Sequence, residues 1–457
     1  MRNLVVMGSA LLMASAHVVA SNQLYVPSGS SVSMAGMSHP HLASSGRYNP
    51  AMSFMNTNEA RFSIFDTSLY LNAGGAGEVL RFAGDVSDVL DEADFEDDGI
   101  EQVEDVLNAG LSNLDDQFFA EGGAILNMPI TPLQLKFIAL NGPITFSLSG
   151  MTSARGTLLY APLSIDAEAD DLDDDDFDPV EAIDTRSSVY LKKSQILNFS
   201  FSYAQPFPTM NVLGARTIVG ARTNVIVGDL YKQVIPITSL ATAENGYVED
   251  LQTELIDSVL APNLQVKATV DIGVLFQRRE GHVGVTAYNI NRPRFFYNTL
   301  GGDCAAITNE DEQTACFNAE YFAAVGKISL EEEHRMEPRI TVEAARYFDN
   351  YGYEVIVGGS ADLWAATDLF GERSQVFTGG VMLVPDAWYW PKARFGMQLD
   401  LQDPEFLQFG LGLTFFNVLQ MDGSMAANFE DLRNGDAIEQ ANAFRSASAS
   451  LSLNVAF

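Results

Sequence analysis

Much of the chain alternates between apolar and polar residues, most clearly in its second half. In residues 393–402, Phe395 and Met397 have one parity, and Arg394 and Asp400 have the other. Successive side chains of a strand point to opposite faces, so this segment is predicted to be a strand with one apolar face. The same pattern predicts strands at residues 212–228, 267–277, 354–363, 407–416 and 449–457. Runs of about ten residues are long enough for a tilted strand to cross a bilayer.

Earlier parts of the chain carry weaker strand signals. Residues 61–72 place Ile64 and Asp66 on one face and Phe65 on the other. Further patterns predict a hairpin formed by residues 144–150 and 156–165, and a strand at 196–205.

Two folds fit such alternation: a soluble sandwich with its apolar faces inward, and a membrane barrel with its apolar face outward. The runs exceed the roughly 5–6 residues of an average soluble strand. The polar face mixes both charge signs with glycine, which suits a lumen, so the barrel is favoured. Aromatic residues near the strand ends are candidates for interface girdles: Tyr347, Phe348, Tyr351, Tyr353, Trp388, Tyr389 and Trp390.

Helical periodicity interrupts the strands in three places. In residues 100–118, apolar residues such as Val103, Leu107 and Leu111 recur every three or four positions, opposite an acidic face. Shorter patterns predict helices around residues 86–90 and at 248–260. These helices are too polar to span lipid, and we expect them to cap a barrel end or cover a strand edge.

Composition narrows the classes of function. The chain of 457 residues has a net charge of −34, which argues against a nucleic-acid partner. Residues 1–20 combine an early Arg2, an apolar core and a small residue at Ala20, which predicts a cleaved signal peptide. The alternative is a buried N-terminal helix.

Cys304 and Cys316 are the two cysteines of the chain. In an exported protein we expect them to form a structural disulfide. A redox pair is the alternative, but the Cys-x-x-Cys spacing that favours it is absent.

Two polar segments leave alternatives open. Residues 21–58 have no persistent period and fit either a compact segment packed against the rest of the chain or a mobile leader. The aspartate-rich run at 166–184 is predicted to be a solvated loop, and weak binding of divalent cations there is the alternative.

Motifs for catalysis are not found. The sequence has no His-Glu-x-x-His zinc motif, no nucleophile elbow and no phosphate-binding loop. His39 and His41 are predicted to be polar loop residues, with a metal site as the alternative. We therefore expect no enzyme, no cofactor and no metal. A hydrolase with its site at the barrel rim is the alternative, because some outer-membrane proteases and phospholipases place His with Asp or Ser there.

Charged residues on the polar strand faces are the main candidate site residues. They are predicted to line the lumen, either as salt bridges or along a solute path: Arg216, Arg222, Asp271, Glu354, Asp362, Arg394 and Asp400.

Several short motifs together resemble a known family. They are Asn49-Pro50-Ala51, Gly214-Ala215-Arg216, Gly220-Ala221-Arg222-Thr223-Asn224, Leu230-Tyr231-Lys232-Gln233, Met336-Glu337-Pro338-Arg339 and the terminal Phe457. They resemble the TraF-like conjugal transfer proteins of proteobacteria, which are similar to the long-chain fatty acid transporter (FadL) group of outer-membrane barrels. The resemblance implies an all-β, antiparallel outer-membrane β-barrel of about 14 strands over residues 59–457. It also implies that residues 21–58 form a plug in the lumen, with Asn49, Pro50 and Ala51 as its turn.

This resemblance gives the functional expectation. The protein is expected in the outer membrane of a Gram-negative bacterium, in contact with lipid, where it takes up or binds a small hydrophobic solute. The alternative is a structural or interaction component of a conjugal transfer or surface apparatus.

Overall fold

The structure is a computed structural model that describes residues 32–34, 42, 45–55, 61–75, 79, 81–82, 85, 99–115, 118–129, 131–136, 140–165, 183–212, 214–241, 264–428 and 444–456. Several predictions lie outside these residues: the signal peptide, His39, His41, the helices around 86–90 and at 248–260, residues 166–182 of the acidic run, and Phe457.

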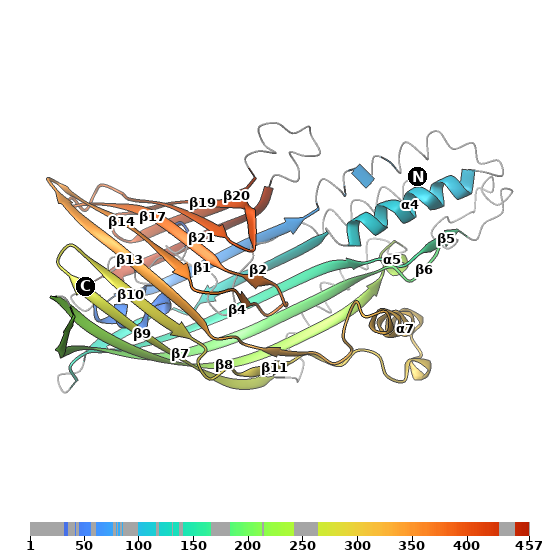
Figure 1. Cartoon of the computed structure of the whole chain (residues 1–457), viewed down its shortest axis with the longest axis horizontal. Helices are drawn as coiled ribbons and strands as arrows, with labels where there is room; N and C mark the ends of the chain where they lie inside the picture. The colour runs from blue at the N-terminus through green and yellow to red at the C-terminus, as the bar shows by residue number, and fades with distance from the viewer. Residues whose placement is uncertain are drawn as a thin grey trace.

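Fourteen of the described strands form one closed antiparallel barrel (Figure 1). In chain order they are β1 (Arg61–Gly74), β2 (Phe119–Asn127), β4 (Pro143–Leu159), β7 (Ser188–Val212), β8 (Ala215–Pro236), β9 (Gln265–Arg278), β10 (Gly281–Tyr288), β13 (Arg339–Asn350), β14 (Tyr353–Asp362), β17 (Val376–Pro385), β18 (Lys392–Asp400), β19 (Asp403–Phe415), β20 (Leu419–Ala427) and β21 (Phe444–Ala456). Each pairs with its neighbours in this order, and β21 pairs with β1 to close the ring. The predicted all-β barrel of about 14 strands is confirmed.

One barrel position is divided between two strands. β2 pairs with residues 149–157 of β4, and β3 (Leu133–Lys136) pairs with residues 143–146 on the same edge. Ser63 of β1 bridges to Thr131, which lies between β2 and β3. β2 and β3 therefore fill the gap between β1 and β4 together.

The two ends of the barrel differ. At one end, here called the turn end, short connections such as residues 279–280 and 351–352 join the strands. At the other, here called the loop end, residues 401–402 join β18 to β19, whereas the other connections are long and carry smaller elements. These are α4 (Gly99–Asp115), β5 (Leu163–Ile165), β6 (Ile183–Thr185), α5 (Ile237–Ala241), β11 (Arg294–Phe296), η5 (Cys304–Ala306), α7 (Glu310–Ala324), β12 (Glu333–Arg335), β15 (Ala366–Thr367) and β16 (Arg373–Ser374). The helix predicted over 100–118 is α4.

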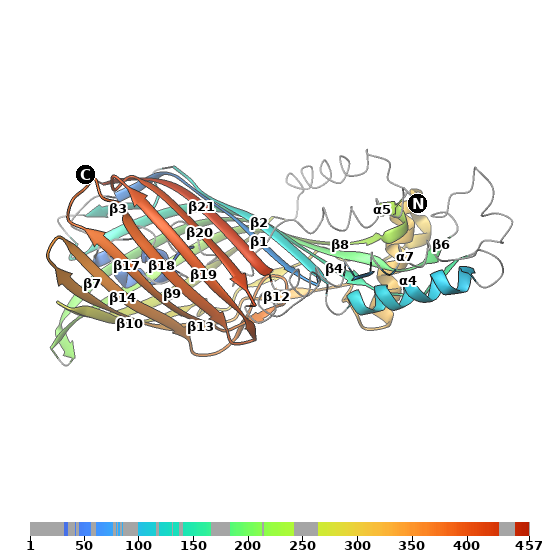
Figure 2. The ribbon, with the colours of Figure 1, turned by 90° about the horizontal axis from the view of Figure 1, so that it is seen from above.

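Three strands continue past the loop end and carry a separate lobe. β4, β7 and β8 extend beyond the other strands, and α4, α5 and α7 gather on this extension (Figure 2). Leu158 packs with α4, whereas the next residue, Leu159, packs with α7. Because successive strand residues face opposite ways, the extension is covered by α4 on one face and by α7 on the other.

Apolar side chains cover the outside of the barrel. Leu69, Val225, Ile272, Phe395 and Leu411 are among the exposed large hydrophobic residues of its strands. The apolar faces predicted for the later strands are therefore outward faces. A closed barrel with an apolar exterior is the architecture of transmembrane β-barrels. Among the described residues, no helix is both long and apolar enough to span a membrane.

Aromatic residues gather at the turn end. Phe348, Tyr351, Tyr353, Trp388, Tyr389 and Trp390 are all exposed there, as expected of an interface girdle. Tyr347 was predicted to belong to this girdle, and that prediction is wrong. It points inward, where its hydroxyl lies 2.6 Å from Nδ1 of His282.

The hairpin predicted from residues 144–150 and 156–165 is also wrong. β4 runs without a turn from Pro143 to Leu159. Gly150 and Gly156 suggested a break, but the strand has partners on both edges, β2 and β7, along this stretch. The backbone hydrogen bonds of the two ladders outweigh the weak strand propensity of these residues.

Candidate functional site

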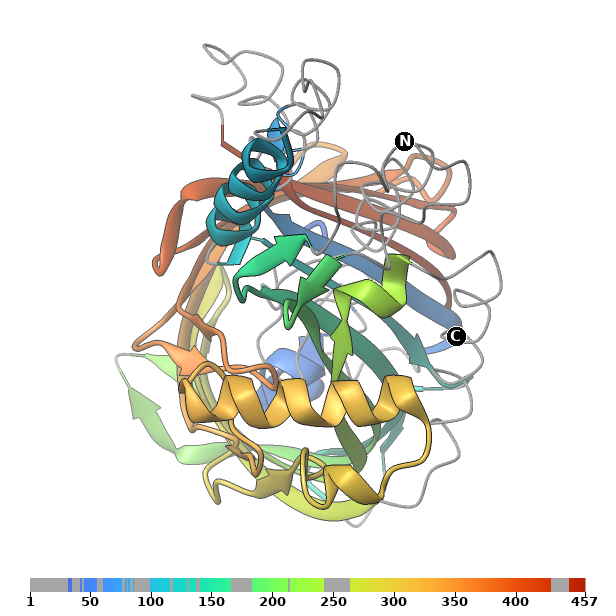
Figure 3. The same cartoon turned by 90° about the vertical axis from the view of Figure 1, so that its right-hand side faces the viewer.

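The candidate site is the lumen between the barrel wall and the N-terminal segment. This segment comprises residues 32–34, α2 (Ser45–Tyr48) and η2 (Pro50–Phe54). Figure 3 views the barrel from its loop end, and the segment lies inside the ring of strands.

The sequence Asn49-Pro50-Ala51 sets the turn between the two short helices. Oδ1 of Asn49 accepts a hydrogen bond of 3.0 Å from the backbone amide of Ala51, which caps η2. Asparagine is a favoured cap, and proline fits the first helical position because no donor is needed there. Asn49, Pro50 and Ala51 are all buried.

Glycines let the wall approach this turn closely. Gly220 and Gly273 are paired across β8 and β9. A Cβ at Gly220 would lie 2.4 Å from the Ala51 amide nitrogen, and one at Gly273 would lie 2.1 Å from Oδ1 of Asn49. Any larger side chain at either position would have to displace the N-terminal segment.

Arg222 connects the wall to the segment. Its Nε donates to Oδ2 of Asp271 at 2.9 Å, and its Nη1 donates to the carbonyls of Gly46, at 3.1 Å, and of Arg47. Asp271 also accepts from the side chain of Asn224 at 2.7 Å and from the amide of Asn289 at 2.9 Å. The carboxylate is fully buried, and these bonds offset the loss of its hydration.

A second attachment involves residues 32–34. Ser33 donates to Asp422, and Asp422 accepts from Nε of Arg394 at 3.0 Å. Arg394 also donates from Nη1 to Thr414 at 2.6 Å. A Cβ at Gly396 would lie 2.3 Å from the Ser33 carbonyl oxygen, so the chain passes directly over the wall here as well.

The wall beside α2 and η2 presents two rows of polar side chains. Strand register aligns them across the sheet: Gln134, Thr145, Ser202, Arg222 and Asp271 in one row, and Ser147, Ser200, Asn224 and Thr269 in the next. Residues that are paired across neighbouring strands point to the same face. The rows therefore form a continuous hydrophilic patch inside the barrel.

A cavity separates this patch from the N-terminal segment. Its volume is about 30 Å³, and it is partly open to solvent. The segment contributes Gly46, Arg47 and Ser53, and the wall contributes Pro132, Gln134, Thr145, Ser147, Ser200, Ser202 and Arg222. Eight of these ten residues carry a hydroxyl, amide or guanidinium group, although apolar atoms form the larger part of the exposed lining.

An apolar cluster lies at the loop end of the lumen. The connections between strands provide Phe295, Tyr297, Met336 and Leu369, which pack on the inward residues Ile196, Ile226 and Leu230. Figure 3 shows α7 crossing in front of this end. We call this group the mouth cluster.

Buried charges surround the mouth cluster. Nζ of Lys192 lies 2.6 Å from Glu332, which also accepts a bond of 3.1 Å from the hydroxyl of Tyr190. Nζ of the fully buried Lys232 donates to the Ser329 carbonyl at 2.5 Å. These contacts fix the connection between β10 and β13 to the wall.

Two titrating groups in the connections are shifted by burial. Burial raises the pKa of Asp368 to about 6, although backbone amides of Glu372 and Phe370 donate to its carboxylate and act against the rise. Burial also lowers the pKa of His334 to about 4, so this imidazole is neutral at pH 7.

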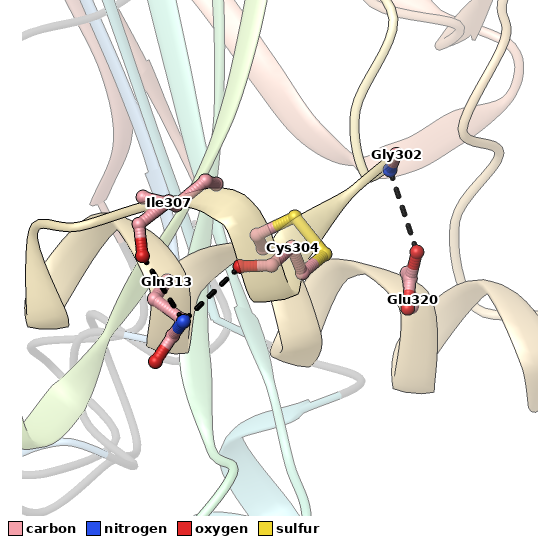
Figure 4. The surroundings of a disulfide bond; sticks show 6 residues. Gly302, Cys304, Ile307, Gln313 and Glu320 are labelled. Carbon is pink, nitrogen blue, oxygen red and sulfur yellow. Dashed lines mark hydrogen bonds between the residues drawn. A yellow bond between two sulfur atoms is a disulfide. The ribbon is translucent and has the colours of Figure 1, made fainter.

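The disulfide joins η5 to α7. Cys304 and Cys316 are bonded, with their Cα atoms 5.6 Å apart (Figure 4). Beside it, Nε2 of Gln313 donates to the Cys304 carbonyl at 3.2 Å. The predicted disulfide is confirmed.

The seven predicted lumen charges all lie on inward faces, at different depths. Arg222, Asp271 and Arg394 are buried beside the N-terminal segment, and Arg216 stacks over the Phe54 ring at 4.7 Å. Asp362 pairs with Arg339 at the loop end. Asp400 accepts bonds of 2.9 Å from the Gln375 and Gln402 amides there, and Glu354 lies half-buried at the turn end. The charges do not form one continuous path.

Sequence reasoning missed part of this site. Asp422 was not predicted, although Gln420, Asp422 and Ser424 alternate with apolar residues and could have been recognised as an inward face. Ser33 lies in a segment without periodicity, so its contact with the wall has no sequence signal. The hydroxyl rows form through the pairing of neighbouring strands, which the pattern of a single strand does not reveal. No cluster of three or more potential metal ligands occurs within the described part of the chain.

One family model matches the sequence of this chain. The family model described as "F plasmid transfer operon, TraF, protein" matches residues 47–357, more than half of the chain. No curated protein matches the sequence.

Solved structures give low overall similarity. The Ralstonia pickettii toluene transporter TbuX is 12% identical, with 96% of this chain and 100% of that one covered and a TM-score of 0.43. The Pseudomonas putida toluene transporter TodX is 8% identical, with coverage of 96% and 98% and a TM-score of 0.38. A Pseudomonas aeruginosa FadL homologue is 10% identical, with coverage of 96% and 99% and a TM-score of 0.32.

Proposed function

The chain belongs to the family described as "F plasmid transfer operon, TraF, protein", and on this premise we propose that it is an outer-membrane β-barrel that binds or passively admits a small solute in its lumen. The N-terminal segment acts as the plug of this barrel. The location rests on the closed ring of strands with its apolar exterior, and on the aromatic side chains at the turn end.

The attachment of the N-terminal segment is the observation that carries the proposal. Arg222 holds the carbonyls of Gly46 and Arg47, and Asp422 holds Ser33. Polar contacts bind this segment to a hydrophilic wall, and a pocket of about 30 Å³ lies between the two. The family resemblance led us to expect a hydrophobic solute; within the described barrel, apolar side chains gather in packed clusters such as the mouth cluster.

Reconstitution in liposomes tests solute passage. We expect slow entry of small solutes through the wild-type protein and faster entry through Arg394→Leu, because this change removes the donor to Asp422 beside Ser33. Arg346→Gln, which alters an exposed arginine at the turn end, is the control. Liposomes that stay impermeable with the wild type and with Arg394→Leu would overturn solute passage. Recovery of the protein in the soluble periplasm would overturn the membrane location.

A second candidate function is an interaction component of a conjugal transfer or surface apparatus. The observation that favours it is the lobe on β4, β7 and β8, which places α4 and α7 beyond the barrel (Figure 1). The family description names a plasmid transfer operon. Plasmid transfer between cells would be measured for a variant with Glu101→Lys and Asp105→Lys, both on α4. Transfer equal to that of the wild type, at equal surface expression, would count against this candidate.

A further inference from the structure

We propose that the cavity between the N-terminal segment and β3, β4, β7 and β8 is a binding site for a small oxyanion, a carboxylate or phosphate group on a small solute. The proposal takes the lumen as a solute space, as the proposed function does, and adds the chemical class of the solute. Binding is tested separately from passage.

The charge of the lining points to an anion. The cavity is lined by the side chains of Arg47 and Arg222, and no carboxylate is among its lining residues. The acidic partners lie behind the arginines: Asp271 follows Arg222 in the register row, and Asp66 is 4.0 Å from Arg47. Each arginine is thus part of an ion pair, and the positive member of each pair is the one that lines the cavity. An anion there would gain attraction that a cation would not.

Hydroxyl groups supply the donors that an oxyanion needs. Thr145, Ser147 and Ser202 come from the two register rows, and Ser53 faces them from η2. Ser200 also lines the cavity, but its hydroxyl already donates to Oδ1 of Asn224 at 2.6 Å. Guanidinium and hydroxyl donors together are the usual partners of carboxylate and phosphate oxygens.

Two of these hydroxyls lack a partner within the described structure. Oγ of Ser53 and Oγ1 of Thr145 are buried and form no hydrogen bond there, and Ser53 is only 3% exposed. A buried hydroxyl without a partner is unfavourable, so a ligand that accepts from it is stabilised. The two atoms come from opposite sides of the cavity, one from the segment and one from the wall.

The size of the site limits the ligand. A volume of about 30 Å³ has room for one or two water-sized groups, such as one carboxylate of a small solute. The remaining atoms of the solute would lie where the pocket opens to solvent. A neutral polyol would use the hydroxyls but gain little from the arginines. A hydrophobic solute would leave the Ser53 and Thr145 hydroxyls unsatisfied.

Binding to the purified full-length barrel in detergent tests the proposal. Calorimetric titration would use malonate, its neutral diamide malonamide, the cation 1,3-diaminopropane and inorganic phosphate. We expect malonate to bind at least about tenfold more tightly than malonamide, and diaminopropane not to bind. Phosphate binding as tight as that of malonate assigns the site to oxyanions in general, and weaker phosphate binding assigns it to carboxylates.

Matched variants locate the binding. Thr145→Val removes an inward hydroxyl, and Thr152→Val removes one on the outward face of the same strand. We expect the first to weaken malonate binding about fivefold and the second to leave it unchanged. Equal binding of malonate and malonamide, or equal loss in both variants, would overturn the proposal. If the barrel binds malonate but liposomes that contain it stay impermeable, the binding site is supported and only the proposed passage of solute is wrong.

Discussion

Asn49 donates a hydrogen bond of 2.7 Å from its side-chain amide to Oε1 of Glu343, 294 residues away in the sequence. Both residues are buried. The same Asn49 caps η2 through its oxygen, so one side chain both shapes the N-terminal segment and ties it to β13.

Asn49→Asp tests this contact. The change places a second carboxylate beside Glu343, and an uncompensated buried charge costs about 3–5 kcal/mol. We expect amide hydrogen exchange in residues 45–55 to become faster, while exchange in the barrel strands is unchanged. The double variant Asn49→Asp with Glu343→Gln should recover much of the protection. Equal exchange in the single and double variants would show that the two side chains do not interact.

A methyl group at Gly273 should displace the segment. The Cβ of Gly273→Ala would meet Oδ1 of Asn49 at 2.1 Å, well inside contact distance. We expect trypsin to cut after Arg47 much faster than in the wild type, with the barrel intact. Gly228→Ala is the matched control, because its Cβ on the inward face of β8 would make only ordinary contacts of 3.4 Å or more. Equal cleavage of both variants would argue against close packing at Gly273.

The barrel was predictable from the sequence because its outer face is uniform. Phe395, Met397 and Leu411 must all face lipid, and a two-residue period survives over whole strands. The pattern failed where the backbone is irregular. A bulge between Ser63 and Phe65 changes the parity of β1, so Ile64 and Phe65 are both exposed and Asp66 is buried, not on the face of Ile64 as predicted.

The candidate site was only partly predictable. Arg222 and Arg394 could be placed on inward faces, but their partners Gly46 and Ser33 are far away in the sequence and have no periodicity. The cavity forms where pairing between β3, β4, β7 and β8 aligns the lining side chains. The sequence of a single strand does not determine that alignment.

Asp368 should make the loop-end connection sensitive to pH. Its pKa of about 6 in the folded state lies above the ordinary value of 3.8, so the folded state binds the proton more tightly than the unfolded state. Stability therefore falls as pH rises from about 4 to 6, by at most about 3 kcal/mol, and then levels off. After correction for intrinsic exchange, the Phe370 and Glu372 amides should lose protection over this range.

Asp368→Asn separates this effect from other titrations. The amide oxygen can still accept from the two backbone donors, but it does not ionise. We expect the protection of both amides to be independent of pH in this variant. The same pH dependence in the variant and the wild type would assign the effect to another group.

Loss of the disulfide should affect the α7 connection alone. On the chain-entropy model, a loop of this length is stabilised by about 3 kcal/mol through its cross-link. Cys304→Ser with Cys316→Ser should therefore speed exchange in residues 303–325, whereas exchange in β13 and β14 stays as in the wild type. Slower folding of the whole barrel in this variant would mean that the connection contributes to strand assembly as well.

Arginine on the outer face tests whether the apolar surface contacts lipid. Leu411 lies near the middle of β19, opposite Phe395 and Gly423, and is 62% exposed. Arginine at the midplane of a barrel costs about 2–4 kcal/mol, and the cost falls towards zero near the interfaces. Leu411→Arg should therefore reduce the amount of heat-modifiable protein in outer-membrane fractions. Leu264→Arg, at a residue 63% exposed just before β9 at the loop end, should assemble like the wild type. The two leucines are almost equally exposed, so if both contacted water, arginine at either position should have the same effect on assembly. A difference between the two variants therefore indicates that Leu411 contacts lipid. Equal assembly of the two variants would place the Leu411 surface in water.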